Sequence, residues 1–309
     1  MADPILHIKD SYYFEVPKAL WRRNYENLDE VPEFLRKAHP EAALEDFNRE
    51  LSGKILIPQP FATLKNLHDK ESGFAISKFM ILELFAAAVI ALIFIRVARN
   101  LSSGDAPRGR LWNMFEAVLV FIRDEIARPA IGKHDADRFV PLLWTMFFFI
   151  LGCNLLGLVP WAGAPTSAFG VTLALAAVTF TTTLLAGMWR FGPIGFWINQ
   201  VPHMELPLLL RPLKLMVFVL EVLGLLIKHA ILSVRLLANM VAGHLVLLGI
   251  MGLIVAAATA STAQWGAIAL ISVISSTLFS LLELLVAFLQ AYIFTFLSAL
   301  FIGAAVHHH

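Results

Sequence analysis

The chain has 309 residues, of which 58% are hydrophobic and 15% are charged, and its formal net charge is +1. This composition excludes a soluble globular enzyme and predicts an all-α polytopic membrane protein. The balanced charge gives no reason to expect a nucleic-acid partner. The single cysteine, Cys153, excludes a disulfide within the chain and does not suggest a metal–thiolate site.

Residues 1–76 are the polar part of the chain. They carry charges of both signs and six prolines, and VPEFLRKAHPEAALEDFNRELSG predicts one or two short helices. The segment is too small and too interrupted for an independent enzyme domain. We expect an extramembrane extension that packs on the membrane part or binds a neighbouring protein. The chain does not open on a basic-then-apolar signal peptide, so we expect the first span to direct insertion.

Residues 77–306 form the predicted membrane domain. Five apolar stretches have the length and composition of membrane-embedded helices. We place them at about 79–97, 139–160, 168–189, 213–258 and 265–306. Basic residues fall on one side of this arrangement, so the positive-inside rule puts the N-terminus outside and the C-terminus in the cytoplasm. The terminal His307–His309 have the composition of a purification-tag remnant, and they predict no metal site.

Residues 111–128 differ from the five spans because they are amphipathic. Apolar side chains recur at helical spacing, and charged side chains occupy the rest of the helical wheel. The apolar positions are Leu111, Phe115, Val118, Leu119, Ile122 and Ile126. The pattern predicts an interfacial helix on the cytoplasmic face of the membrane, with a solvent-facing packing helix as the alternative.

Four charged residues at regular spacing lie on the fourth predicted span. Lys214, Glu221, Lys228 and Arg235 follow one another at intervals of seven residues. In a helix this spacing gives one slowly drifting stripe of charge surrounded by apolar residues. A charge at membrane depth costs several kcal/mol, so such residues are functional candidates, Arg235 above all. Lys214 lies near the end of the span, where we expect it to reach the membrane surface.

The residues between Lys228 and Arg235 could form either a loop or part of a continuous helix. They could form a cytoplasmic loop between two shorter spans, but no Gly, Pro or Asn stands between Lys228 and Leu237 to make a turn. We therefore predict one continuous helix. At about 1.5 Å per residue, 213–258 would be roughly 69 Å long, against about 30 Å of hydrocarbon. We expect this helix and 265–306 to form an overlong, steeply tilted hairpin.

The last span carries a polar stripe of its own. Ser276, Glu283 and Gln290 are spaced by seven residues, and His244 stands on the preceding span. A His–Glu pair titrates near neutrality and can relay protons. Arg235 cannot lose its proton, so it is suited to holding a carboxylate ionised and to blocking proton leakage. The alternative is that these side chains join the helices by hydrogen bonds alone.

Three motifs resemble those of a known family. KHAILSVRLLANMVAGHLVLLGI resembles the signature Arg-Leu-x-x-Asn-Met-x-x-Gly of subunit a of the F-type rotary ATP synthases. The matching residues are Arg235, Leu236, Asn239, Met240 and Gly243. FVPLLWTMFFFILGCNLLGLVPW is similar to the family's hairpin span, and LQAYIFTFLSALFI is similar to its final helix. The motifs cover about 77–306 in the family's order, and 1–75 matches none of them.

This resemblance implies a stator subunit with two proton half-channels facing a rotating c-ring of small two-helix subunits, each with a membrane-buried carboxylate. Arg235 would keep that carboxylate deprotonated as it passes and stop protons from short-circuiting. Further family positions for proton access or for the surroundings of the arginine fall on Glu221, Asn239, His244, Glu283 and Gln290, with Lys228 and Ser276 in support. Other implied partners are peripheral-stalk subunit b, the remaining ATP synthase subunits and the lipid bilayer, which we expect to be a bacterial inner membrane.

The sequence departs from the family pattern at four positions. Many bacterial members carry Glu at position 244 and His at position 283, and both are exchanged here, which supports contact between His244 and Glu283. A proline is common where His229 stands, and a polar residue is common where Gly157 stands. These last two departures concern the lining of the channels and leave the expected role of Arg235 untouched.

Two other classes of function remain open on the residues alone. An intramembrane metalloenzyme could use His229, His244 and Glu283, but the His-Glu-x-x-His spacing is missing. A secondary transporter would bind its substrate at mid-membrane, but such proteins usually show paired repeats or broken helices. No motif predicts a cofactor, and the chain has no Walker-type loop, so ATP chemistry would belong to partner subunits.

Overall fold

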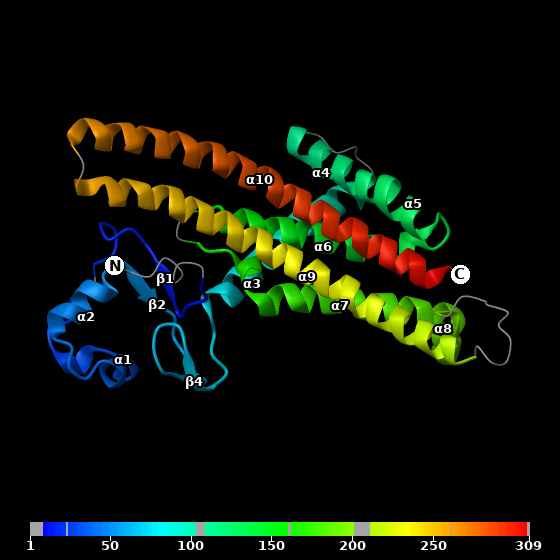
Figure 1. The fold of residues 1–309 in the computed structure, drawn as a ribbon, viewed down its shortest axis with the longest axis horizontal. Coiled ribbons are helices and arrows are strands. Elements are labelled where there is room, and N and C mark those ends of the chain that lie inside the picture. The colour runs from blue at the N-terminus through cyan, green and yellow to red at the C-terminus, as the bar shows by residue number, and fades with distance from the viewer. Residues whose placement is uncertain are drawn as a thin grey trace. The chain divides into compact units, whose positions relative to one another are not determined.

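The computed structural model describes residues 9–22, 24–102, 109–159, 162–200, 211–259 and 261–307. Within these ranges, five helices are long and apolar enough to cross a membrane (Figure 1). They are α3 (Lys78–Ser102), α6 (Ala136–Gly157), α7 (Phe169–Phe191), α9 (Arg211–Ala256) and α10 (Thr262–Val306). The predicted all-α polytopic fold is confirmed, with small differences at the helix ends.

The two last helices, α9 and α10, are unbroken. They contain 46 and 45 residues and are connected through a 3₁₀ turn, Ala257–Thr259. Leucine, alanine and other good helix formers fill α9, and no proline interrupts it after the first turn. The loop alternative around Lys228–Arg235 is therefore wrong, and the continuous helix is confirmed. At about 1.5 Å per residue each helix exceeds twice the hydrocarbon thickness, so both must tilt or bend in a bilayer.

The described residues belong to two compact units, each of which contains several chain segments. The first unit consists of Met1–Ala88, Cys153–Ala168 and Met240–Leu284, and the second of Val89–Gly152, Phe169–Asn239 and Leu285–His309.

Two small two-stranded sheets and two short helices build the N-terminal part of the first unit. Strand β1 (Tyr13–Glu15) pairs antiparallel with β2 (Lys54–Leu56), and β3 (Ala62–Leu64) pairs antiparallel with β4 (Lys70–Gly73). The helices are α1 (Glu33–Ala38) and α2 (Leu44–Leu51). The core consists of Tyr13, Tyr25, Val31, Leu35, Phe47, Leu51 and Leu67. The two helices were expected, whereas strands of three or four residues are too short to show an alternating pattern.

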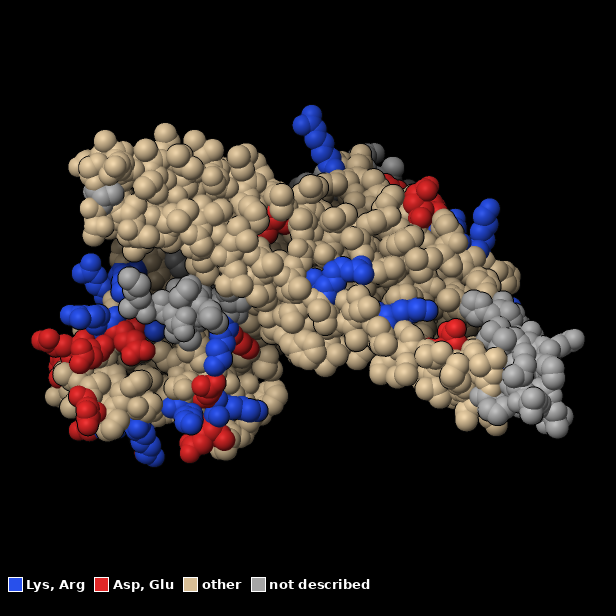
Figure 2. All heavy atoms as spheres, in the orientation of Figure 1, with Lys and Arg blue, Asp and Glu red and all other residues tan. Residues whose placement is uncertain are grey.

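Hydrogen bonds join this N-terminal part to the first turn of α3. The Phe79 amide donates to Asp10 Oδ1 at 3.2 Å, which satisfies one of the free amides at the helix start. The Gln59 side chain donates to the Ile76 carbonyl and accepts from the Ile76 amide, at 2.7 and 2.8 Å. Figure 2 shows charged side chains gathered over these N-terminal elements, whereas the surface over α10 is almost uncharged.

The amphipathic segment of the second unit is a helix with a widened turn. It comprises α4 (Arg110–Phe121), a π-helical segment (Ile122–Ala127) and α5 (Arg128–Ile131). Pro129 has no amide hydrogen and clashes with the carbonyl four residues earlier in a regular α-helix. The π turn relieves this clash, and the Arg128 amide instead bonds to the Arg123 carbonyl five residues back. The expected helix is present, and its place at the membrane surface stays a prediction.

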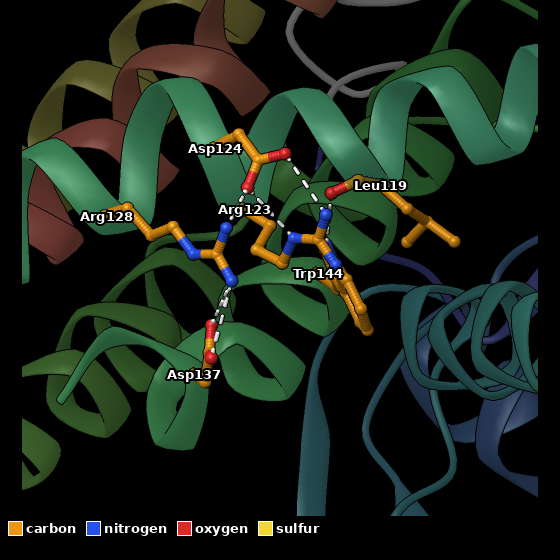
Figure 3. Close-up of polar contacts among 6 residues, drawn as sticks. All are labelled: Leu119, Arg123, Asp124, Arg128, Asp137 and Trp144. Carbon is orange, nitrogen blue, oxygen red and sulfur yellow. Dashed lines mark hydrogen bonds and ion pairs between the residues drawn. The ribbon is translucent and has the colours of Figure 1, made fainter. Parts of the chain in front are cut away.

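Ion pairs surround this π turn (Figure 3). Asp124 accepts hydrogen bonds from Arg123 at 3.0 and 3.1 Å and from Arg128 at 2.8 Å. Arg128 also reaches Asp137, at the start of α6, at 3.3 Å. The indole of Trp144 donates to the Leu119 carbonyl at 2.9 Å. The amphipathic helix is thus fixed to α6 by charge at one end and by a neutral hydrogen bond nearer its middle.

Close approach of small residues holds the other helices of the second unit together. The buried face of α7 is made of Thr172, Ala176, Thr179, Thr183, Ala186 and Gly187. Ser233 of α9 donates to Thr172 at 3.1 Å. A short helix that was not predicted, α8 (Pro193–Asn199), follows α7, and residues 201–210 lie outside the described part of the chain.

Candidate functional site

Arg235 lies in the second unit, at the middle of α9. Ser233 and Leu236 beside it are buried, Val234 is exposed, and the arginine itself is half-buried. Within the described part of the chain its guanidinium makes no hydrogen bond or ion pair. A guanidinium carries five donors and a permanent charge, so Arg235 needs a partner that the described residues do not supply.

Two of the predicted site residues in the second unit carry side-chain amides. Asn239 follows Arg235 by one helical turn, and Gln290 lies on α10. Both side chains are half-buried, and neither makes a hydrogen bond to another residue that the structure describes. The alternative that Asn239 and Gln290 only join helices by hydrogen bonds gains no support, because their amide groups make no such bond with the described residues.

The acid and the imidazole meet in the first unit. His244 Nδ1 lies 3.1 Å from Glu283 Oε1. Glu283 is 6% exposed, and neither of its carboxylate oxygens has a hydrogen-bond partner of good geometry among the described residues. The exchanged pair inferred from the sequence is therefore in contact. A buried carboxylate with free lone pairs beside an imidazole can accept or release a proton at little geometric cost.

Backbone carbonyls fix the imidazole ring beside Glu283. His244 Nδ1 lies 3.0 Å from the Met240 carbonyl, and Nε2 lies 3.1 Å from the Gly157 carbonyl at the end of α6. Carbonyls only accept, so both ring nitrogens face acceptors, which suits an imidazolium that donates from both. A side chain at Gly157 would collide with Met240, so the glycine allows this approach.

A cavity in the second unit brings Glu221 and Lys228 together. Its volume is about 320 Å³, and both charged side chains are exposed. The other residues that line it are Gln200, Leu225, Phe301, Ala304 and Ala305. A carboxylate and an ammonium at the mouth of a cavity of this size can hold water between them.

The supporting residues are arranged less specifically. Ser276 donates to the Val273 carbonyl of its own helix at 3.0 Å, so its hydroxyl is already satisfied. Lys214 is exposed near the start of α9. No cluster of three His, Cys, Asp or Glu side chains that could hold a metal ion is found among the described residues. The metalloenzyme alternative therefore gains no support.

Sequence reasoning missed the backbone part of the acid–imidazole site. Gly157 was noted only because a polar side chain was expected there, yet it contributes its carbonyl oxygen to His244. A glycine at a position where a polar side chain is expected leaves room for a main-chain group to make the contact instead. This signal could have pointed to the Gly157 carbonyl. The secondary-transporter alternative gains no support either, because α9 and α10 are not broken as the helices of such proteins usually are.

Comparison with known proteins extends the likeness beyond single residues. A family model described as "ATP synthase A chain" matches residues 80–303. The ATP synthase subunit a of Anaeromyxobacter sp. (strain Fw109-5) is 44% identical over 233 residues, which are 75% of this chain and 55% of that protein. The corresponding protein of Chloroherpeton thalassium is 38% identical over 276 residues, covering 87% of this chain and 79% of the relative.

A third relative, the ATP synthase subunit a of Myxococcus xanthus, is 42% identical over 229 residues, covering 73% of this chain and 72% of the relative. The chain spans 55%, 50% and 58% of three Anaeromyxobacter relatives that it matches. The family model covers the membrane helices, the acid–imidazole pair and Arg235, and it begins after the N-terminal extension. On this evidence the chain belongs to the ATP synthase A chain family.

Proposed function

We propose that the chain is the stator proton-channel subunit of an F-type ATP synthase, which couples proton flow to ring rotation and ATP synthesis. The observation that carries the proposal is the guanidinium of Arg235, which lies in the middle of an apolar helix and has no partner among the described residues. A rotating ring that presents one buried carboxylate after another would supply the missing counter-charge. Because the guanidinium stays charged, it favours the ionised carboxylate and repels a proton that approaches from either side.

Two groups of residues support two separate proton routes. The His244–Glu283 pair would serve the half-channel that opens to the outside, since its carboxylate has free acceptor sites. The cavity with Glu221 and Lys228 would serve the half-channel that opens to the cytoplasm. Asn239 and Gln290 would complete the surroundings of the ring carboxylate, with Ser276 as a lesser contributor. ATP chemistry would be carried out by soluble partner subunits.

The proposed partners are the c-ring, peripheral-stalk subunit b and the remaining subunits of the complex. Exposed apolar side chains along α10 suit contact with lipid or with another apolar helix. They include Leu270, Ile271, Ile274, Leu278, Leu281, Leu282 and Leu285. We assign the chain to a bacterial inner membrane, with residues 1–76 outside and the C-terminus in the cytoplasm. Basic residues after α3 and at the end of α7 support this orientation.

ATP-driven proton pumping tests the proposal. Arg235→Ala in membranes that contain the whole complex should abolish pumping while the complex still assembles. Lys214→Ala is a matched control, because it removes an exposed charge from the same helix. Its pumping should remain close to that of the unmodified complex. Full pumping by the Arg235→Ala complex would reject the role given to this residue.

A further inference from the structure

His229 is a buried histidine that the proposed proton routes do not use. It is 3% exposed and lies on α9, within the second unit. The rings of Phe180 and Phe301 flank it, with centroids at 5.2 and 4.8 Å. Its Nε2 atom is buried and has no hydrogen-bond partner among the residues that the structure describes. An unpartnered buried polar atom is costly, so it needs an explanation.

The other ring nitrogen fixes where the proton sits. His229 Nδ1 lies 2.9 Å from the Leu225 carbonyl of its own helix. A carbonyl can only accept, so Nδ1 carries the hydrogen, and in the neutral ring Nε2 carries a free lone pair. The buried atom without a partner is therefore a base. Protonation of Nε2 would place an imidazolium between two aromatic rings, which attract cations.

A single layer of side chains separates His229 from the cavity of Glu221 and Lys228. Phe301 lines this cavity and also packs on the imidazole. Leu225 lines the cavity too, and its carbonyl holds the imidazole. A rotation of the Phe301 ring would open a path from the water in the cavity to Nε2. Side-chain rotations of this kind are fast compared with catalytic turnover.

Among the described residues, the charged side chains that line the neighbouring cavity both come from α9. Lys228 is the residue that precedes His229, and Glu221 lies about two turns earlier on the same helix and lines the same cavity. The side chains that approach from α7 and α10, Phe180 and Phe301, do not titrate. With neutral His229 the two charges of the cavity cancel. An imidazolium beside Lys228 would make the group net positive and would oppose the approach of further protons.

We propose that His229 is a proton-accepting residue of the cytoplasmic half-channel, which exchanges protons with the Glu221–Lys228 cavity when Phe301 moves aside. In this step Nε2 binds a proton delivered by a hydronium ion or a water chain, the donor becomes water, and the ring charge changes from zero to +1. The reverse step returns the proton to the cavity. This inference rests on the proposed function and adds a second protonatable group to Glu221.

The pH dependence of proton pumping distinguishes this role from simple packing. In inverted vesicles the medium sets the pH at the cytoplasmic face of the whole complex. Lowering the pH of the medium from about 8 to about 5.5 favours the imidazolium and depletes the neutral form that accepts a proton. We expect the ratio of pumping by the unmodified complex to that by His229→Phe to fall by about 2-fold to 10-fold over this range. His229→Gln, which is polar but does not titrate, should behave like His229→Phe.

A ratio that is constant with pH for both variants, with normal assembly, would overturn the inference. The proposed function fails differently, since it requires that the unmodified complex pump protons and that Arg235→Ala abolish pumping. A complex that meets both requirements and shows a flat ratio would refute only the role of His229.

Thiol labelling tests the path through Phe301 without an activity assay. In a Cys153→Ser background, His229→Cys should react slowly with a small water-soluble thiol reagent added at the cytoplasmic face. Adding Phe301→Ala should make the reaction several times faster, because the side chain between cavity and thiol is removed. Ser233→Cys in the same Phe301→Ala background is the matched control, since Ser233 is also on α9 and is fully buried. Equal labelling at both positions would contradict the path.

Discussion

His244 and Glu283 form an acid–imidazole contact in which Nδ1 and Oε1 are 3.1 Å apart. The contact depends on a neighbour without a side chain. A Cβ at Gly243 would lie 2.6 Å from Glu283 Oε1 and 3.1 Å from its carboxyl carbon. The glycine therefore leaves the space that the carboxylate fills, which gives a physical reason for the glycine in the Arg-Leu-x-x-Asn-Met-x-x-Gly motif.

Gly243→Ala should lower proton pumping more than it lowers assembly. The added methyl group would push the carboxylate away from His244, and a displacement of about 1 Å at a functional group can cost up to roughly 100-fold in rate. Gly249→Ala, on the same helix, is the matched control, because no described residue lies within 4 Å of its added methyl group. We would measure ATP-driven pumping per assembled complex. Equal pumping by the two variants would mean that the position of Glu283 does not matter.

Exchange of the pair should be tolerated better than the loss of either member. His244→Gln and Glu283→Gln each leave one titratable group without its partner and should reduce pumping strongly. The double variant His244→Glu with Glu283→His restores the pair in the opposite order. We expect it to pump better than His244→Glu or Glu283→His alone. If the double variant is as poor as the worse single variant, the two side chains do not act together.

Much of the membrane fold was predictable because it follows from apolar length alone. The continuity of α9 was predictable because no turn-forming residue stands near Lys228 and Arg235. The contact of His244 with Glu283 could be inferred from their exchange. By contrast, the hydrogen bond between the Gly157 carbonyl and His244 could not be predicted from the side chains, because it involves a main-chain oxygen. The strands near the N-terminus were missed because β1 and β2 are three residues each.

The π turn shows a second limit of sequence reasoning. Pro129 signals that the helix cannot continue in a regular way, and the predicted helix ended just before it, at residue 128. The helix instead widens, so that α4 and α5 remain one element. Its ion pairs join Asp124 within the turn to Arg128 just after it, and Arg128 to Asp137 on the next helix. Ion pairs between two helices cannot be predicted from helix propensity or from the spacing of charged residues along one helix.

Gly303→Ala should destabilise the second unit. An added methyl group would collide with the Ala130 carbonyl and would lie 3.3 Å from Ile131 Cα. Overpacking against backbone costs about 1–3 kcal/mol, because backbone cannot rotate away. Gly266→Ala on the same helix meets nothing within 4 Å and should be neutral or slightly stabilising, since alanine favours a helix. Thermal unfolding of the purified complex would separate the two, and equal melting temperatures would contradict the close packing of α5 on α10.

The pH dependence of the π turn follows from the charge on Asp124. Hydrogen bonds from Arg123, and the charges of Arg123 and Arg128, hold the pKa of Asp124 below its ordinary value of 3.8. A carboxyl whose pKa is lower in the folded state stabilises the fold above its unfolded pKa, and this contribution is lost as pH falls through the folded pKa. The ion pairs should therefore be complete at neutral pH and should weaken only below about pH 4.

Asp124→Asn should reproduce at neutral pH the loosening that acid causes in the unmodified chain. We expect lower amide-exchange protection over 122–131, because Arg123 and Arg128 lose the negative charge that they share and one of the two carboxylate oxygens is replaced by an amide donor. Glu125→Gln is the matched control on the same turn, since Glu125 is exposed and makes no ion pair with the described residues. It should leave protection unchanged. If both variants exchange alike, or if the Asp124→Asn segment still loosens below pH 4 as much as the unmodified one, another carboxyl controls the π turn.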